Sequence, residues 1–311
     1  MKRAVVTGGA GFIGSHLVKR LVGLGWNVTV LDNLSTGSRT NLSGVDCEII
    51  ECDITGELPV VPHSALFHLA APVSVVESLE NPDKYYKEIV DGTSNVVEWS
   101  KGLGAKTMVL ASTAAIYGDS EDLPLGEDRE PNPMSPYAKA KYFAERVLEE
   151  ETKNTDVRAV ALRFFNVFGD GQRDTGGYVS VIPIFRRLWE AGRPMTINGD
   201  GEQTRDFIWV EDIVSALVES RRAEVGFSLY NVGSGEETSV NQVAEAFGGE
   251  VIYRDPIHEP RRSLACISKI KNELNWSPKG SVENWIETIR LMTYINIYER
   301  QGSTNNYFRR F

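Results

Sequence analysis

The sequence predicts an α/β protein, a doubly wound parallel sheet with a smaller C-terminal α/β domain. Three observations support this prediction. Short apolar segments alternate with helical segments through the first half, a glycine-rich turn joins the first such pair, and the alternation loosens after residue 165. With 311 residues, the chain is long enough for two domains or for one large α/β domain with an insertion.

Six apolar segments in the first half have the length and composition of buried strands. Helical segments separate most of them, at about 11–25, 82–102 and 135–150. Because parallel neighbours need a crossover connection, strands that alternate with helices fit a sheet covered on both faces. The expected strands are RAVVTG (3–8), NVTVLDN (27–33), CEIIECDI (47–54), ALFHLAA (65–71), KTMVLAST (106–113) and VRAVALRFFNVFG (157–169).

The second half has a looser pattern. Loops rich in glycine and aspartate alternate with shorter helical segments. We expect residues 1–165 to form the first domain, with later elements near 206–235 returning to it, and residues 166–311 to form mainly the second domain. The expected helices of this half lie near 180–191, 210–221, 239–247 and 281–299.

Composition argues against several functional classes. Hydrophobic residues make up 41% of the chain and charged residues 24%, as in a globular protein with a sizeable core. A net charge of −10 and a pI of about 5.1 argue against a nucleic-acid surface, although a local basic pocket could hold a phosphorylated small molecule. No apolar run is long enough to span a membrane, so no membrane association is expected.

The cysteines and histidines predict neither disulfides nor a metal site. The cysteines form no CxxC pair and are expected to be reduced thiols of a cytoplasmic protein. A strand begins almost at the first residue, which leaves no room for a signal peptide. The histidines show no metal-ligand spacing. These residues are Cys47, Cys52 and Cys266, and His16, His63, His68 and His258.

The segment TGGAGFIGSHL, at residues 7–17, has the pattern of a phosphate cradle. Glycines between a strand and a helix permit a tight turn and a close approach of the backbone to a pyrophosphate, and the helix N-terminus supplies free N–H groups. Asp32 ends the next strand, where an acidic residue meets the adenosine ribose and repels a 2′-phosphate. The pattern therefore predicts NAD(H). The alternative is a turn needed only for helix–strand packing. The glycines are Gly8, Gly9, Gly11 and Gly14.

Further residues are expected to line the same cofactor site. Asp53 and Ile54, at the end of the third strand, would sit beside the adenine, although an ordinary strand end is an equal alternative for these two. The remaining candidates adjoin the cradle, the second strand and the fourth strand, and are Phe12, Ile13, Asn33, Leu69, Ala70 and Ala71.

Tyr137 and Lys141 lie one helical turn apart in SPYAKAKYFAERVLEE, the helix that follows the fifth strand. The pKa of a phenol, about 10, is too high for a base near neutrality, but a nearby ammonium stabilises the phenolate. Thr113, at the end of the fifth strand, could orient a substrate hydroxyl toward Tyr137. The three residues predict a base that deprotonates a hydroxyl beside a hydride acceptor. The alternative is an accidental pair.

At this point the chain resembles the extended short-chain dehydrogenases/reductases of the nucleotide-sugar type, close to the UDP-glucose/UDP-N-acetylglucosamine 4-epimerases. The resemblance covers about residues 1–300. It implies a Rossmann-like domain with tightly bound NAD, a C-terminal sugar-nucleotide domain, a homodimer formed through two helices per subunit, and Thr113, Tyr137 and Lys141 as catalytic residues. The motifs are TGGAGFIGSHL, DNLSTG, HLAA, STAAIYGD, SPYAKAK, LRFFNVFG, GDGEQTRDF and YNVGSG.

The resemblance also implies ligands for the diphosphate of a UDP-sugar. Asn166 and Arg205 match such positions, and an amide donor and an arginine fork suit phosphate oxygens. The alternative for Arg205 is an ion pair with Asp206 or Glu202.

A further arginine of the substrate site is expected near residue 260. We assign Arg261, but the chain has RDPIHEP where the family usually has Arg-Pro-Gly, so Arg254 or Arg262 could take this role. Two other departures are Cys266 in place of the usual aspartate and Ile89 in place of the usual asparagine.

Ala114 and Ala115 follow Thr113, where family dehydratases carry an acidic pair and UDP-glucuronate decarboxylases tend to keep a glutamate. The resemblance therefore implies plain epimerisation at C4 through a 4-keto sugar that turns over between two hydride transfers. Ser263 matches a residue beside the sugar, where a small side chain would admit a 2-N-acetyl group, or it is only a loop residue. The alternatives are a UDP-glucuronate 4-epimerase, another enzyme of the family that modifies NDP-sugars, and a non-catalytic NAD-sensing regulator.

Overall fold

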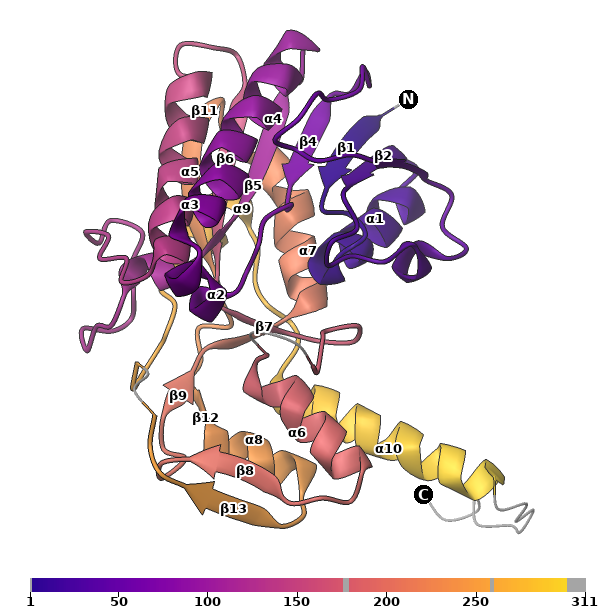
Figure 1. The fold of residues 1–311 in the computed structure, drawn as a ribbon, viewed down its shortest axis with the longest axis vertical. Helices are drawn as coiled ribbons and strands as arrows, with labels where there is room; N and C mark the ends of the chain where they lie inside the picture. Colours follow the sequence, from indigo (N-terminus) through magenta and orange to yellow (C-terminus); the bar gives the residue numbers. More distant parts are fainter. Residues whose placement is uncertain (1, 176–178, 258–259, 301–311) are drawn as a thin grey trace.

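The computed structural model describes residues 2–175, 179–257 and 260–300. Its central element is a seven-stranded sheet in the order β11-β6-β5-β4-β1-β2-β3, in which every pair is parallel (Figure 1). The predicted fold class is confirmed. The strands are β1 (Arg3–Thr7), β2 (Asn27–Asp32), β3 (Glu48–Glu51), β4 (Ala65–His68), β5 (Thr107–Thr113), β6 (Arg158–Phe164) and β11 (Gly226–Val232).

The strand order reverses between β1 and β4. From β1 the chain moves outward to β2 and β3, then returns to β4 on the other side and continues to β5, β6 and β11. In an open parallel sheet, this reversal leaves a crevice outside the carboxyl ends of the two central strands. The topology therefore places a ligand site next to Thr7 and His68, where β1 and β4 end.

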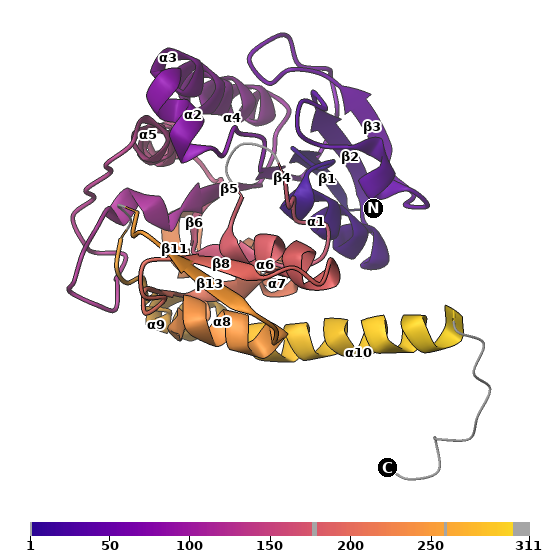
Figure 2. The same cartoon turned by 60° about the horizontal axis from the view of Figure 1, so that its bottom comes forward.

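Helices cover both faces of the sheet (Figures 1 and 2). One face packs against α1, α7 and α9, and the other against α3, α4 and α5. These helices are α1 (Phe12–Gly23), α7 (Val210–Glu219), α9 (Ser268–Leu274), α3 (Pro82–Tyr86), α4 (Gly92–Gly102) and α5 (Pro136–Thr152), with α2 (Val75–Glu80) beside them and short turns η1 (Arg39–Leu42), η3 (Ala114–Tyr117) and η4 (Ser220–Arg222).

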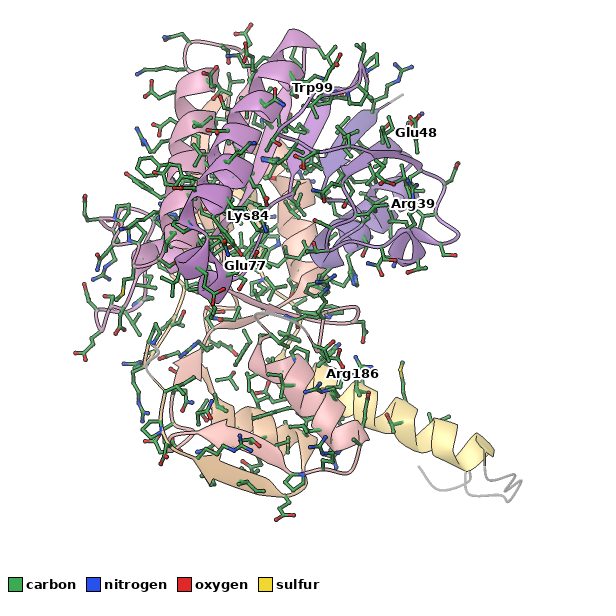
Figure 3. The ribbon with its side chains drawn as sticks, in the orientation of Figure 1. Arg39, Glu48, Glu77, Lys84, Trp99 and Arg186 are labelled. Carbon is green, nitrogen blue, oxygen red and sulfur yellow. The ribbon has the colours of Figure 1, made fainter. Side chains whose placement is uncertain are left out.

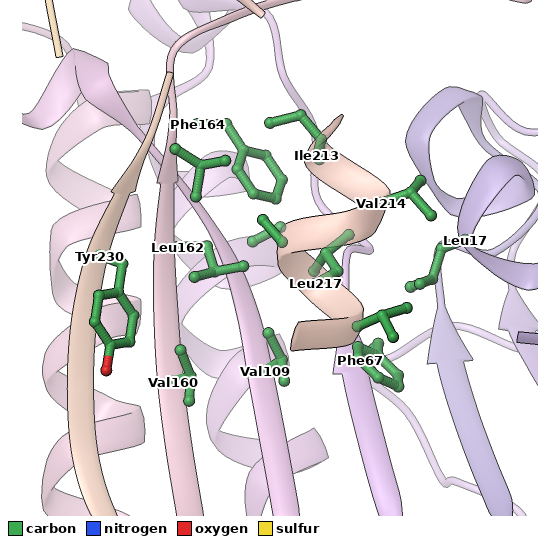
Figure 4. Packing of buried hydrophobic residues seen from close by; sticks show 14 of the residues in the cluster. Leu17, Phe67, Val109, Val160, Leu162, Phe164, Ile213, Val214, Leu217 and Tyr230 are labelled. Atoms are coloured by element: carbon green, nitrogen blue, oxygen red, sulfur yellow. The ribbon is translucent and has the colours of Figure 1, made fainter. Parts of the chain in front are cut away.

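The core under α7 shows how the second half of the chain completes the first. Leu217 and Ile213 of α7 lie over Leu162 and Val109 of the sheet, and all four side chains are buried (Figure 4). Truncation of such a leucine to alanine typically costs about 2–5 kcal/mol, because the cavity fills only partly. The helix therefore belongs to the sheet domain by its packing, although it lies at residues 210–219.

The smaller unit has its own core, in which Phe168, Phe185, Phe247 and Ile286 pack together. Figure 1 shows this unit below the carboxyl ends of the large sheet. Its elements are β7 (Asn166–Phe168), α6 (Val181–Glu190), β8 (Met195–Asn198), β9 (Thr204–Arg205), β10 (Phe207–Trp209), β12 (Thr238–Ser239), α8 (Val240–Phe247), β13 (Val251–Arg254) and α10 (Val282–Arg300).

The single helix expected over 82–102 is interrupted. A π-helical turn, η2 (Lys87–Asp91), separates α3 from α4, and the hydroxyl of Thr93 in α4 donates to the carbonyl of Ile89 in this turn at 2.5 Å. The short helices α2 and α9 were not predicted, because six or seven residues are too few for a helical period to be recognised. Within the described residues, no helix is both long and apolar enough to cross a bilayer.

Candidate active site

The glycine turn between β1 and α1 has a backbone that only glycine accommodates at two positions. Gly8 has φ of +70°, and a Cβ there would lie 2.7 Å from the Ala70 nitrogen. A Cβ on Gly14 would lie 2.1 Å from the Gly8 carbonyl oxygen. Gly11 caps α1 without a side-chain hydrogen bond, so the N–H groups of Phe12 and Ile13 carry no side-chain cap. An uncapped helix N-terminus behind a glycine turn suits a pyrophosphate.

Asp32 ends β2 and holds the two loops at this edge of the sheet. Its carboxylate accepts hydrogen bonds from the Ala10 N–H at 2.9 Å and from the Leu34 N–H at 2.8 Å. Each oxygen of a carboxylate has a second lone pair, so binding to a ribose is compatible with this role. Asn33 follows, and its side-chain amide donates to Asp53 at 3.3 Å.

Asp53 and Ile54 follow the end of β3. Asp53 accepts hydrogen bonds from the backbone and the hydroxyl of Thr55, and these bonds lower the pKa of its carboxyl group. The Ile54 side chain belongs to the hydrophobic cluster between the sheet and α4. It lies so close to Gly92 of α4 that a Cβ on that glycine would be 2.8 Å from it. Both residues thus have structural contacts of their own, and their contact with an adenine stays a prediction.

Leu69, Ala70 and Ala71 continue β4 directly opposite the glycine turn. The Leu69 N–H donates to the Thr7 carbonyl at 3.1 Å, and the Ala70 N–H to the Thr7 hydroxyl at 3.3 Å. All three side chains are partly exposed, on the rim of the crevice between β1 and β4. Below them, burial lowers the pKa of His68 to about 3, so this imidazole is neutral.

Thr113 is the last residue of β5, and Tyr137 lies in the first turn of α5. The Thr113 hydroxyl oxygen accepts the Ala115 N–H at 3.2 Å, which leaves the hydroxyl proton free to be donated to a ligand. Ser135 caps α5, and Pro136 occupies its first turn, so Tyr137 lies at the end of the helix nearest the crevice. Tyr137 is 9% exposed, and its ring meets the Tyr85 ring edge to face at a centroid distance of 6.4 Å.

Lys141 lies one turn further along α5 and is only 5% exposed. Its ammonium donates to the Ala111 carbonyl at 3.0 Å, two residues before Thr113 on β5. Burial lowers the pKa of Lys141 to about 8, and the negative charge of Glu145 opposes that shift. The sheet and α5 therefore hold a cation within one turn of Tyr137, next to the strand end that carries Thr113.

Asn166 and Arg205 lie on short strands at the junction between the two units. The Asn166 amide donates to the Asp206 carbonyl at 3.2 Å, and Arg205 Nη1 donates to the Thr204 carbonyl at 2.8 Å. Asp206 is fully buried, and its carboxylate accepts hydrogen bonds from Ser234, from the Gly235 N–H and from the Ala265 N–H. These bonds fix the strand that carries Arg205.

The loop after β13 brings its arginines to carboxylates of the second unit. Arg261 makes a bidentate pair with Asp200 at 2.8 and 2.9 Å, and Arg262 pairs with Glu237. Arg254, the third candidate arginine, is the last residue of β13 in the smaller unit.

Ser263 is partly buried in the next part of that loop. Two backbone hydrogen bonds tie this part to the large domain, from Leu125 to Leu264 at 2.8 Å and from Cys266 to Leu125 at 2.9 Å. The described residues include no group of three or more His, Cys, Asp or Glu side chains that could hold a metal ion. His258, the fourth histidine, lies outside the described residues.

Comparison with known families decides the assignment. Residues 4–233 match the NAD dependent epimerase/dehydratase family. The chain belongs to this family. The resemblance drawn from the motifs is thereby confirmed, and so is the prediction of NAD as the cofactor, because the matching family is NAD dependent. The uncapped helix N-terminus of the cradle fits this cofactor.

Individual relatives cover almost the whole chain. The chain is similar to the UDP-glucose 4-epimerase of Mycolicibacterium smegmatis, with 35% identity over 91% of this chain and 96% of the relative. It is also 35% identical to UDP-glucuronic acid decarboxylase 1 of Xenopus tropicalis, over 91% of this chain and 70% of the relative. The crystal structure of the Thermotoga maritima UDP-glucose 4-epimerase with UDP-glucose superimposes with a TM-score of 0.87 at 34% identity, covering 94% and 99% of the two chains.

Three parts of the site of this family member were not predicted. Tyr85 packs against Tyr137, and its hydroxyl donates to Glu77, which also pairs with Lys84 at 2.8 Å (Figure 3). No sequence signal links residues this far apart. Arg173 donates to the Thr36 carbonyl at 2.6 Å and so ties the loop after β7 to the loop after β2.

The third missed residue, Glu145, had a signal in the sequence. Tyr137, Lys141 and Glu145 are spaced four residues apart and so share one face of a helix. A buried glutamate on that face could have been expected from the spacing alone, since Tyr137 and Lys141 were already placed in the site.

Proposed function

We propose that this protein catalyses the NAD-dependent epimerisation of a UDP-sugar at C4. The observation that carries the proposal is the gathering of Thr113, Tyr137 and Lys141 at the carboxyl edge of the sheet, beside the glycine cradle. Family membership and the similarity to UDP-glucose 4-epimerases support the same reaction.

The residues of the cradle fit the dinucleotide. Gly8 and Gly14 leave space that a Cβ would fill, and the uncapped turn at Phe12 and Ile13 offers N–H donors to the phosphates. Asp32 would accept a hydrogen bond from the adenosine ribose, and Asn33, Asp53, Ile54 and residues 69–71 would line the rest of the cofactor. These residues would hold oxidised NAD, which would supply a reversible hydride acceptor for C4 of the sugar.

The catalytic roles follow from the chemistry of the side chains. Thr113 would donate its free proton to the substrate and orient the 4-hydroxyl toward Tyr137. Tyr137 would take the proton of that hydroxyl and return it to the product, while the ammonium of Lys141 stabilises the phenolate. Tyr137 and Lys141 are buried and Thr113 is partly buried, so the reduced access of water would strengthen each of these interactions.

The second unit would hold the UDP part. Asn166, Arg205 and Arg261 would donate to the diphosphate, and Arg261 would leave Asp200 to do so. With binding energy concentrated on the UDP group, the sugar would be free to rotate about its link to the diphosphate and present its other face.

Ala114 and Ala115 distinguish epimerisation from elimination or decarboxylation in this family. Both lie in η3 directly after Thr113, and neither can donate or accept a proton. We propose that the similarity to a UDP-glucuronic acid decarboxylase reflects the shared fold and cofactor, and not a shared reaction.

Ser263 would lie beside the sugar and admit a 2-N-acetyl group. The test compares kcat/KM for UDP-glucose and UDP-N-acetylglucosamine in the wild type and in Ser263→Tyr. Loss of only the acetylated substrate in Ser263→Tyr supports this role, and equal use of both sugars by the variant excludes it.

We also propose a homodimer that acts in the cytoplasm. Tyr86 and Phe143 are exposed side by side, with ring centroids 5.5 Å apart, on the helical face that would meet a second copy. The described cysteines are all free thiols, as a reducing compartment requires. Light scattering of the wild type and of Phe143→Glu checks the assembly, and a wild-type monomer would contradict it.

The function itself is tested by incubating the purified protein with a panel of UDP-sugars, without added NAD. We expect interconversion of UDP-glucose and UDP-galactose, and a loss of kcat of at least about a thousandfold in Tyr137→Phe, because the proton acceptor is lost. Tyr142→Phe, on the same helix, is the matched control and should keep its activity. Full activity in Tyr137→Phe would show that the base is misassigned.

A further inference from the structure

Glu145 is a buried carboxylate on the same helix face as Tyr137 and Lys141, and only 2% of it is exposed. It accepts a hydrogen bond from the Ser112 hydroxyl at 2.5 Å. It also accepts two from Arg163, Nε at 3.0 Å and Nη2 at 2.8 Å. A buried carboxylate with three donors cannot change its position without leaving charges unpaired.

These contacts lie in the same layer as the catalytic residues. Ser112 stands between Ala111, whose carbonyl binds the Lys141 ammonium, and Thr113. Lys141 and Glu145, one turn apart on α5, are therefore bonded to consecutive residues of β5. The strand end that carries Thr113 and the helix that carries Tyr137 are locked together at two adjacent points.

Arg163 is itself held from the far side. It lies opposite Ser112 in the register of β5 and β6, and its guanidinium lies over the Tyr117 ring at 4.7 Å. The Tyr117 hydroxyl donates to Asn231 of β11 at 2.6 Å. The guanidinium of Arg163 is therefore packed between Glu145 and the Tyr117 ring.

We propose that Glu145 is a positioning residue for the proposed reaction, which keeps the buried ammonium of Lys141 charged and in place for proton transfer at Tyr137. This inference rests on the proposed function. Among the described residues, the hydrogen bonds of Glu145 are to Ser112 and Arg163, so its effect on the reaction would be transmitted through Lys141.

The charges around Lys141 explain why such a residue is needed. The titratable groups that face it are Tyr137 and Glu145 on α5 and His68 at the end of β4, with Arg163 behind Glu145 and Tyr85 behind Tyr137. His68 is neutral. Glu145 is the negative charge that opposes the desolvation of the lysine. Without it, burial would lower the pKa of Lys141 further, and the ammonium would lose its proton near neutral pH.

A purely structural account of the pair is less economical. A buried arginine–glutamate pair is weak support for stability, because well-packed apolar residues of similar size are often as stable. An apolar pair at these two positions would, however, leave the lysine without a counter-charge. The pair therefore fits a requirement of Lys141 better than a requirement of the fold.

The first test measures Lys141 directly and does not depend on turnover. The titration of Lys141 is followed by NMR of protein labelled with 13C-lysine, with the signal assigned from Lys141→Met. We expect Glu145→Gln to lower the midpoint by one pH unit or more. Glu150→Gln, an exposed glutamate on the same helix, is the matched control and should leave it unchanged.

The second test measures turnover against pH. If the midpoint falls from about 8 to about 7, the protonated fraction at pH 8 falls from about one half to about one tenth, so kcat should fall roughly fivefold there and less than twofold at pH 6. KM should stay within a factor of two, because Glu145 touches no substrate group.

Glu145→Gln leaves Arg163 buried without its partner and could fail to fold, so two further variants keep the proposal testable. Ser112→Ala removes one donor to Glu145, and the double variant Glu145→Gln/Arg163→Met removes both charges of the pair. The proposal requires the titration midpoint of Lys141 in the double variant to stay below the wild-type midpoint, even if the double variant is as stable as the wild type.

An unchanged midpoint in Glu145→Gln, or full recovery of the pH profile in the double variant, would overturn the proposal. A wild type without epimerase activity would overturn the proposed function instead. The NMR titration would then still report whether Glu145 controls Lys141.

Discussion

Two arginine–carboxylate pairs, each with two hydrogen bonds between the side chains, lie in different surroundings. Arg163 and Glu145 meet inside the large domain at 3.0 and 2.8 Å, with side chains 2% and 3% exposed. Arg261 and Asp200 meet on the smaller unit at 2.8 and 2.9 Å, and both side chains are 58% exposed. The chemistry is the same in both, so the difference between them comes from solvent.

That difference separates a fixed pair from an exchangeable one. Removing one partner of a buried pair leaves an uncompensated charge in the interior, whereas an exposed pair contributes only about 0–1 kcal/mol. Arg261 lowers the pKa of Asp200 to about 2, yet water can replace either partner at little cost. The buried pair is suited to hold the proposed catalytic residues in place, and the exposed pair is suited to release its arginine to the proposed phosphate ligand.

The largest expected effect comes from substituting the buried arginine, which tests whether the buried pair matters more for stability than an exposed one. Arg163→Met should lower the free energy of unfolding by about 3–5 kcal/mol, because Glu145 is left without its main partner. Urea denaturation measures the change. The matched control is Arg146→Met on the surface of α5, whose partner is Glu149, and it should change stability by less than about 0.5 kcal/mol. Equal effects of the two substitutions would refute the distinction.

A second prediction concerns the cost of burying Lys141. A pKa lowered from 10.5 to about 8 means that burying the charged Lys141 destabilises the fold by an amount on the order of 3 kcal/mol. Replacing Lys141 by methionine removes this cost but also removes the hydrogen bond to Ala111, which stabilises the fold by about 1 kcal/mol. Lys141→Met should therefore be more stable than the wild type by about 2 kcal/mol at pH 7, while losing most of its turnover.

The gain in stability should depend on pH in one direction. Below pH 8, Lys141 is charged in both the folded and the unfolded state, and the full cost is present. Between about pH 8 and 10.5 only the unfolded state keeps the proton, so the cost disappears as the pH rises. Denaturation of both proteins at pH 7 and pH 10 measures this. A gain that persists unchanged at pH 10 would contradict the assignment.

A third prediction addresses the exposed pair through substrate binding. Under the proposed role of Arg261, Arg261→Ala should raise KM for UDP-sugars about tenfold, with kcat unchanged within about threefold, because one charged contact to the diphosphate would be lost. Steady-state kinetics and thermal denaturation together measure the effect, and stability should not change. Arg254→Ala is the comparison variant. A larger rise in KM for Arg254→Ala would transfer the role to that arginine.

The smallest predicted effect comes from releasing Arg261 in advance. Asp200→Asn removes the carboxylate that competes with a diphosphate, and because an exposed pair is worth less than about 1 kcal/mol, KM should fall by no more than about fivefold. Steady-state kinetics with a UDP-sugar measures the change in KM. Asp255→Asn serves as the control, and a rise in KM for Asp200→Asn would show that the pair positions Arg261 for binding.

The sequence by itself determined the parts of this protein that depend on neighbours along the chain. The alternating apolar segments were sufficient to predict the fold class, and the glycines between β1 and α1 were sufficient to predict the cradle. The spacing of Tyr137 and Lys141 was sufficient to predict that they share one helix face. Each of these depends on backbone preference or on helical period, which act over a few residues.

Only the tertiary structure decided which distant groups meet. Ser112, Glu145 and Arg163 come from a strand, a helix and the next strand, and Arg261 and Asp200 are 61 residues apart. The partners of a buried charge depend on strand order and register, which place residues far apart in sequence opposite one another. No local preference specifies them, because the free energy that selects them comes from excluding water around the assembled sheet.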